Sequence, residues 1–145
     1  MARPTNTRFA LGVHMLTLLG GAADPVSSEV LAGSAGSNPV HARRVLARLR
    51  AAGLVESRPG VGGGWQLAAE PAAITLADVW RAVQGDDPLL GLHDANPACT
   101  VGQRIQNALV DVNRRAGAAI ESELELTTIK ELEHDTLARE LERVG

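Results

Sequence analysis

The chain has 145 residues, of which 45% are hydrophobic and 21% are charged. This length suits one compact unit of about 100 to 150 residues, and this composition excludes a disordered or collagen-like chain. Because Phe9, Trp65 and Trp80 are the only aromatic residues, the core must be built from aliphatic side chains, which favours packed helices over a β-sandwich.

The formal net charge of −3 hides an asymmetry along the chain. Residues 1–66 hold seven arginines against three acidic side chains, whereas residues 67–145 hold seven basic and fourteen acidic side chains. A basic half joined to an acidic half indicates that the first half meets a polyanion. On charge alone, chance segregation of solvated side chains stays open.

The apolar stretch 9–19 has two interpretations. Because Arg3 and Arg8 precede it, it has the outline of a secretory leader. His14 interrupts it, however, and its apolar residues recur at helical spacing, so we expect an amphipathic core helix. That helix should be capped by Asn6 or Thr7 and stopped by a left-handed glycine in the pair 20–21. No segment reaches the roughly 20 apolar residues of a membrane span, and we expect a cytoplasmic protein without a membrane partner.

Residues 27–53 predict two further helices joined by a tight turn. Ser27 or Ser28 can cap a helix that runs to about residue 34, and Asn38 followed by Pro39 is a typical start for the next, which should end at Gly53. On a helical wheel this third helix has an apolar face and an opposite, cationic face. The core face holds Ala42, Val45, Leu46 and Leu49, and the cationic face holds Arg43, Arg44 and Val40. The pattern is that of a helix-turn-helix.

Residues 54–67 predict a β-hairpin, with strands over 54–58 and 65–67 and a glycine-rich tip. A hairpin directly after a recognition helix is a wing, and Arg58 at its base could reach a phosphate or the minor groove. An ordinary β-turn remains the alternative. The tip is not a phosphate-binding loop, because no helix follows it and Trp65 occupies the position of the last fingerprint glycine.

The second half predicts three helices and a loop. Thr75 and Asp78 should cap a helix that ends at Gly85, and the segment 86–98 is loop-like. Thr100 and Gln103 form an expected capping box for the longest helix, and a last helix should run from about residue 128 to 143. The apolar stripe of the long helix consists of Val101, Ile105, Leu109, Val112, Ala116 and Ile120.

This stripe extends over roughly 30 Å at about 1.5 Å per residue, more than a domain of this size needs to cover its own core. We therefore expect a homodimer packed along it, with packing inside one chain as the alternative. Two-fold symmetry would place the recognition helices about 34 Å apart, one DNA turn, which suits a palindromic operator.

The succession of these motifs resembles the Rrf2 family of bacterial winged-helix regulators. The resemblance covers nearly the whole chain and rests on the segments 38–40, 43–46, 49–55, 59–67 and 74–79. It implies a mostly α fold with a small β-hairpin: a winged helix-turn-helix over 1–85, then a linker and dimerization helices over 86–145. It also implies a homodimeric transcription factor, usually a repressor, with its third helix in the major groove of double-stranded DNA and its wing at the minor groove.

The resemblance and the pattern together single out the DNA-binding residues. These are Asn38, Val40, His41, Arg43 and Arg44 at the recognition helix, and Arg58, Gly62 and Gly63 in the wing. The assignment of Arg58 has an alternative, since the wing arginine of the family sits one position later, where this chain has Pro59.

Cysteine usage departs from the family pattern. The cluster-binding members carry three cysteines after the wing, and this chain has only Cys99. An iron-sulfur centre needs about four ligands, commonly thiolates, so we expect the cluster-free branch and no cofactor. Just before a helix start, Cys99 is either a sensor of oxidants with a lowered thiol pKa or a small buried hydrophobe.

No other chemistry is predicted. His14, His41, His93 and His134 are too scattered for a metal site, and no nucleophile-base pair suggests an enzyme. A sequence-specific DNA-binding regulator is the favoured function. The alternative is a winged-helix interaction module that acts through a protein partner. An effector is compatible with either function, and its identity is not encoded in these patterns.

Overall fold

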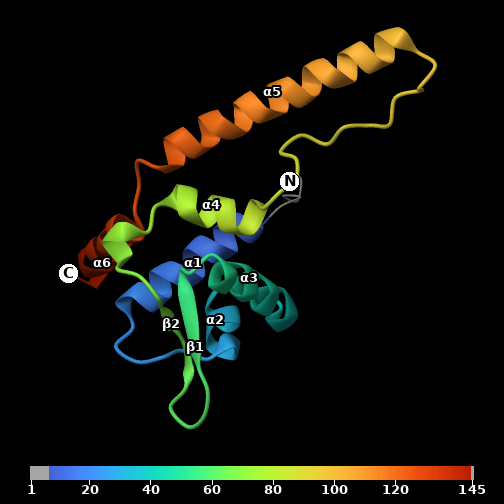
Figure 1. Ribbon diagram of the computed structural model, residues 1–145. Coiled ribbons are helices and arrows are strands. Elements are labelled where there is room, and N and C mark those ends of the chain that lie inside the picture. Colours follow the sequence, from blue (N-terminus) through green and yellow to red (C-terminus); the bar gives the residue numbers. More distant parts are fainter. Residues whose placement is uncertain (1–6, 145) are drawn as a thin grey trace.

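The computed structural model describes residues 7–144, so Asn6, one of the two expected caps, lies outside the described residues. The fold is mostly helical with a two-stranded antiparallel sheet, as predicted (Figure 1). Its elements are α1 (Arg8–Gly21), α2 (Ser28–Ser34), α3 (Pro39–Ala51), β1 (Val55–Arg58), β2 (Gly64–Leu67), the short 3-10 helix η1 (Pro71–Ala73), α4 (Leu76–Gln84), α5 (Thr100–Leu124) and α6 (Ile129–Val144).

Helix α1 is the central core helix that its periodicity predicts. Met15 and Leu16 are fully buried, and Gly12 allows α4 to approach so closely that a Cβ there would lie 3.1 Å from Cγ1 of Val79. All four residues of the expected α3 core face are buried against this helix or its neighbours. Burial of these aliphatic side chains is the main favourable term in the stability of the fold.

The expected glycine stop of α1 is wrong. Gly20 and Gly21 form the last turn of the helix, neither has a positive φ, and the chain leaves the helix at Ala22 in an extended conformation. Gly20 instead lies in close contact with α6, where a Cβ would be 2.9 Å from Oε2 at the end of the Glu133 side chain. Gly20 therefore lies at a contact between two helices, α1 and α6, that are far apart in the sequence.

The predicted hairpin forms, and its register places Val55 opposite Leu67 and Arg58 opposite Gly64. Val26, in the segment before α2, adds a bridge to it: its N–H donates to the carbonyl of Trp65 at 2.9 Å, and the Trp65 N–H donates to the Val26 carbonyl at 2.7 Å. Gly64 makes this approach possible, since a Cβ there would lie 2.8 Å from the Val26 backbone. The wing is thus fastened to the helix-turn-helix.

Helix α6 returns to the first half of the chain and packs along α1 (Figure 1). Ile129, its first residue, is fully buried and donates its N–H to the carbonyl of Ile74 at 2.9 Å. Thr128 accepts from the Glu131 N–H, which gives the predicted start of this helix. The C-terminal helix therefore shares the core of the winged helix.

Helix α5 lies along α4 at one end, while its N-terminal end extends away from the other helices (Figure 1). Arg81 of α4 holds the near end through ion pairs with Glu121 and Glu125. Not one residue of this 25-residue helix is buried. Within residues 7–144, no helix is both long enough and apolar enough to cross a membrane.

The start of α5 differs from the expected capping box of Thr100 and Gln103. The backbone is still extended at Cys99, so Cys99 is the N-cap and Thr100 is the first helical residue. The Cys99 Sγ accepts from the Gly102 N–H at 3.3 Å, the bond that a capping hydroxyl would otherwise make. Because Cys99 is exposed, its interpretation as a buried hydrophobe is also wrong.

Candidate nucleic-acid interface

The turn between α2 and α3 is built by local backbone chemistry. Gly36 adopts a φ of +61°, which a residue with a Cβ resists, and Asn38 caps α3 by accepting from the Val40 N–H at 2.8 Å. Pro39 takes the first helical position, where no N–H is needed. The structure thus places Asn38 at the helix start with its side-chain oxygen engaged in the cap.

The outer face of α3 carries the predicted recognition residues. Val40 is 53% exposed, Arg43 and Arg44 are exposed, and His41 is half-buried at the edge of this face. Within the described part of the chain, the Arg44 guanidinium has no hydrogen-bond or ion-pair partner. The face is cationic, and its Arg44 guanidinium is exposed, as a helix that enters a groove requires.

Arg43 is engaged differently. Its Nη2 lies 3.1 Å from Oε1 of Glu29 on α2, and both side chains are exposed. The pKa of Glu29 is lowered, first by a backbone hydrogen bond at the helix start and then by the hydrogen bonds from Arg43 and Ser28. An anionic ligand at this surface would therefore compete with Glu29 for the Arg43 guanidinium.

Two further arginines of α3 turn back onto the protein, which the helical wheel did not reveal. Arg48 donates from Nη1 to the carbonyl of Val83 on α4 at 2.8 Å, and the Arg50 guanidinium lies 5.8 Å from the centre of the Trp65 ring. The signal for Arg48 was its position three residues after the buried Val45, at the border of the core face. These two side chains fix α3 against α4 and the wing.

The wing has the geometry of a tight, exposed tip. Gly62 has a φ of +75° with open space around its Cα, whereas a Cβ on Gly63 would lie 2.1 Å from the carbonyl oxygen of Arg58. The Arg58 side chain is exposed at the end of β1. Val61 is fully exposed at the tip. The sequence analysis did not single out this exposed apolar side chain, although its position within a glycine run was the available signal.

The predicted stripe of α5 faces solvent. Val101 and Ile105 are more than half exposed, Leu109 and Val112 are also exposed, and Ala116 and Ile120 are partly covered near α4. Large aliphatic side chains in a row are costly to leave in water. The stripe is therefore an unpartnered apolar surface of this chain.

Comparison with known proteins identifies relatives over nearly the whole chain. A family model, Rrf2, described as "Iron-dependent Transcriptional regulator", matches residues 5–135. YwnA of Bacillus subtilis (strain 168), which is named as an HTH-type transcriptional regulator, is 39% identical over 128 residues, covering 88% of this chain and 95% of YwnA. The HTH-type transcriptional regulator CymR of the same organism is 32% identical over 95 residues, covering 65% of this chain and 69% of CymR.

The iron named in that family description does not fit the donor atoms of this chain. Cys99 is its one thiol, and that thiol accepts the capping N–H of α5. Among residues 7–144, no three His, Cys, Asp or Glu side chains gather where they could hold a metal ion. One thiol from each of two chains falls short of the four or so ligands of an iron-sulfur cluster.

Solved structures match the fold as well. CymR (YrzC), the global cysteine regulator of B. subtilis, superposes with a TM-score of 0.61 at 28% identity, covering 92% of this chain and 98% of CymR. IscR of T. potens superposes with a TM-score of 0.64 at 26% identity, covering 94% of this chain and 90% of IscR. These relatives are regulators rather than enzymes, and the fold presents a helix-turn-helix with a wing. The chain therefore belongs to the Rrf2 family and is a DNA-binding transcriptional regulator.

Proposed function

We propose that the protein is a homodimeric repressor that binds a palindromic operator without an iron-sulfur cluster. The observation that carries this proposal is the combination of two exposed surfaces on one chain: the cationic face of α3 and the apolar stripe of α5. The first suits a polyanion, and the second suits another copy of itself.

The major-groove reader is α3. Arg44 is free to make a bidentate contact with a guanine, Val40 can contact a thymine methyl, and Arg43 can leave Glu29 for a phosphate or a base. Asn38 and His41 lie at the start of the helix, where Asn38 fixes the helix direction through its cap and retains its amide donors for a phosphate. In this arrangement Asn38 positions the helix on the DNA backbone, and Arg44 and Val40 contact the bases.

The wing supplies the second contact. The sequence placed Arg58 at the base of the wing, but it ends β1 beside the tip, opposite Gly64. Gly62 and Gly63 form the tip, so that its backbone can approach the sugar-phosphate edge closely. Because Val26 fastens the hairpin to the segment before α2, the wing and α3 are held as one surface. The exposed Arg58 guanidinium is placed to contact a phosphate at the edge of the minor groove.

The α5 stripe forms the dimer. In a symmetric pair each stripe covers the other, which removes apolar side chains such as Ile105 and Leu109 from water. Within residues 7–144, only the loop 86–98 runs beside the far end of α5, and no other helix or strand packs along it. Dimer formation then sets the spacing of two recognition helices, about one DNA turn for a palindrome.

The test is a binding titration with DNA from upstream of the protein's own gene, repeated at several salt concentrations. We expect affinity to fall steeply with salt, because Arg–phosphate contacts release counterions. Sedimentation should give a dimer in the absence of DNA, and in vitro transcription should be reduced by the protein. A salt-independent association, or a monomer that ignores DNA, would favour an interaction module that acts through a protein partner.

A further inference from the structure

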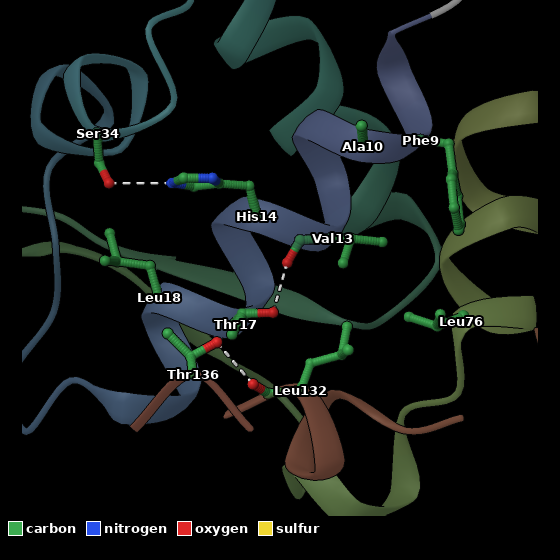
Figure 2. Close-up of a pocket in the computed structure, with 10 residues that line it drawn as sticks. All are labelled: Phe9, Ala10, Val13, His14, Thr17, Leu18, Ser34, Leu76, Leu132 and Thr136. Atoms are coloured by element: carbon green, nitrogen blue, oxygen red, sulfur yellow. Dashed lines mark hydrogen bonds between the residues drawn. The ribbon is translucent and has the colours of Figure 1, made fainter. Parts of the chain in front are cut away.

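Two adjoining pockets lie against α1, and they differ in the polar groups that line them. The first, of about 630 Å³, is shown in Figure 2. Its four polar side chains are all paired inside the protein: His14 with Ser34 at 3.0 Å, and Thr17 and Thr136 as donors to carbonyls of their own helices. No polar group there specifies the chemistry of a ligand.

The second pocket has about 470 Å³ and shares Thr17, Leu18 and Thr136 with the first. It lies between α1, α6, α2 and the segment before α2. Of its remaining lining residues, only Glu133 carries a charge. The others are apolar or small: Gly21, Ala22, Val26, Val30 and Leu137. Several of its lining residues, including Val30 and Leu137, are exposed, so the pocket is an open apolar groove. Its single charged group favours a ligand that is itself mostly apolar with one charge.

Glu133 has no partner for that charge within the described chain. Its Oε2 is buried and accepts no hydrogen bond, and no basic side chain of residues 7–144 forms an ion pair with it. A buried carboxylate oxygen without a partner is costly, and each such group in a native protein calls for an explanation.

The surroundings make this position more unfavourable. The carboxylate lies over the C-terminal end of α1, where a Cβ on Gly20 would be 2.9 Å from Oε2 and a Cβ on Gly21 would be 4.0 Å from Oε1. The C-terminal end of a helix carries partial negative charge on its free carbonyls. Carboxylate and helix end therefore create negative potential at one point, which a cation would relieve.

We propose that this second pocket binds a small organic cation with an apolar body. Its ammonium group meets Oε1 of Glu133, the carboxylate oxygen on the side of the lining residue Gly21, and its hydrocarbon part lies against Leu18, Val26 and Val30. A bare divalent metal fits poorly, because the apolar walls offer too few oxygen ligands, and an anion is repelled. Val26 also holds the wing through its backbone bonds to Trp65, so the ligand would contact the segment that fastens the wing.

The test uses calorimetric titration of the full chain without DNA, so that its outcome is independent of operator binding. The probes are 4-phenylbutylammonium, 4-phenylbutan-1-ol and 4-phenylbutanoate, which share a skeleton and differ in charge. We expect the cation to bind once per chain, at least tenfold more tightly than the alcohol, and the anion not to bind. Glu133→Gln should weaken the cation at least tenfold and leave the alcohol unchanged, whereas the exposed Glu131→Gln should behave as wild type.

Thermal unfolding supplies a second readout. Without ligand, Glu133→Gln should melt at the same or a higher temperature, because it removes an unpaired carboxylate from a helix C-terminus. Equal affinity for the three probes, no cation binding at millimolar concentration, or no effect of Glu133→Gln would overturn the proposal. So would a marked loss of thermal stability or a change in self-association in Glu133→Gln, since either would mean that protein groups already pair with the carboxylate.

Discussion

Nη2 of Arg43 on the recognition helix lies 3.1 Å from Oε1 of Glu29 on α2, on the surface that we expect to face DNA. The ion pair is exposed, so it contributes little to stability. It does control which charge the DNA meets. A phosphate or guanine that takes Arg43 must displace Glu29 and lie near its carboxylate, so Glu29 opposes binding.

Replacement Glu29→Gln should therefore strengthen DNA binding, by about 3- to 10-fold at moderate salt, and raise the magnitude of the salt slope. Fluorescence anisotropy with operator and random DNA measures both. Because the pKa of Glu29 is lowered in the folded protein, its carboxylate and the ion pair persist as pH falls below the usual glutamate range, and the effect should hold across neutral pH. The distant Glu131→Gln is the matched control, and equal changes in both variants would contradict the role of Glu29.

Arg44→Ala tests base reading on the free side of α3. If its guanidinium contacts a guanine, the specific operator loses about 1 to 3 kcal/mol while random DNA changes little. Arg58→Ala in the wing should instead weaken both DNAs alike, as a phosphate contact would. Arg48→Ala serves as a contrast, because Arg48 bonds the Val83 carbonyl and its loss should lower thermal stability as well as affinity. An Arg44→Ala variant that binds both DNAs as wild type would remove Arg44 from the interface.

The sequence predicted the elements closely wherever local chemistry decides them. The Asn38-Pro39 start of α3, the Thr75–Asp78 capping box and the glycine-rich wing tip each depend on residues within four positions of one another. Periodicity likewise identified the buried face of α3, because burial follows the helical repeat.

Prediction failed where a distant residue decides the local outcome. Gly20 was expected to stop a helix, but the helix continues through it and it packs against Glu133, more than a hundred residues later. Arg48 and Arg50 could not be separated from Arg43 and Arg44 by charge alone, since their partners Val83 and Trp65 belong to other elements. Cys99 is the N-cap of α5 because the helix begins at Thr100, one residue earlier than a capping box of Thr100 and Gln103 predicts.

Substitution of Gly63 and of Gly62 in the wing tip should be unfavourable for different reasons, a steric clash at Gly63 and a positive φ at Gly62. Gly63→Ala places a Cβ 2.1 Å from the Arg58 carbonyl, so the hairpin must shift, and we expect a loss of DNA affinity of tenfold or more with helix content retained. Gly62→Ala meets open space but keeps a positive φ, which costs about 1 kcal/mol. Gly33→Ala, in α2 with open space and no positive φ, is the control and should be neutral or slightly stabilising. Circular dichroism melts and anisotropy titrations separate the three, and a Gly63→Ala variant with wild-type affinity would place the wing away from DNA.

Dimerization through α5 is tested by adding a charge to its apolar stripe. Ile105→Asp or Leu109→Asp would bury an unpaired carboxylate in the pair, and we expect a monomer by sedimentation. Each monomer should keep its helix content and core, because α5 contributes no buried residue. Operator affinity should fall steeply, since one recognition helix then binds without its partner. Asn107→Asp adds the same charge on the opposite side of α5 and should leave the dimer intact. If the stripe variants sediment as wild type, another surface joins the two chains, and the spacing of the two recognition helices must be set elsewhere.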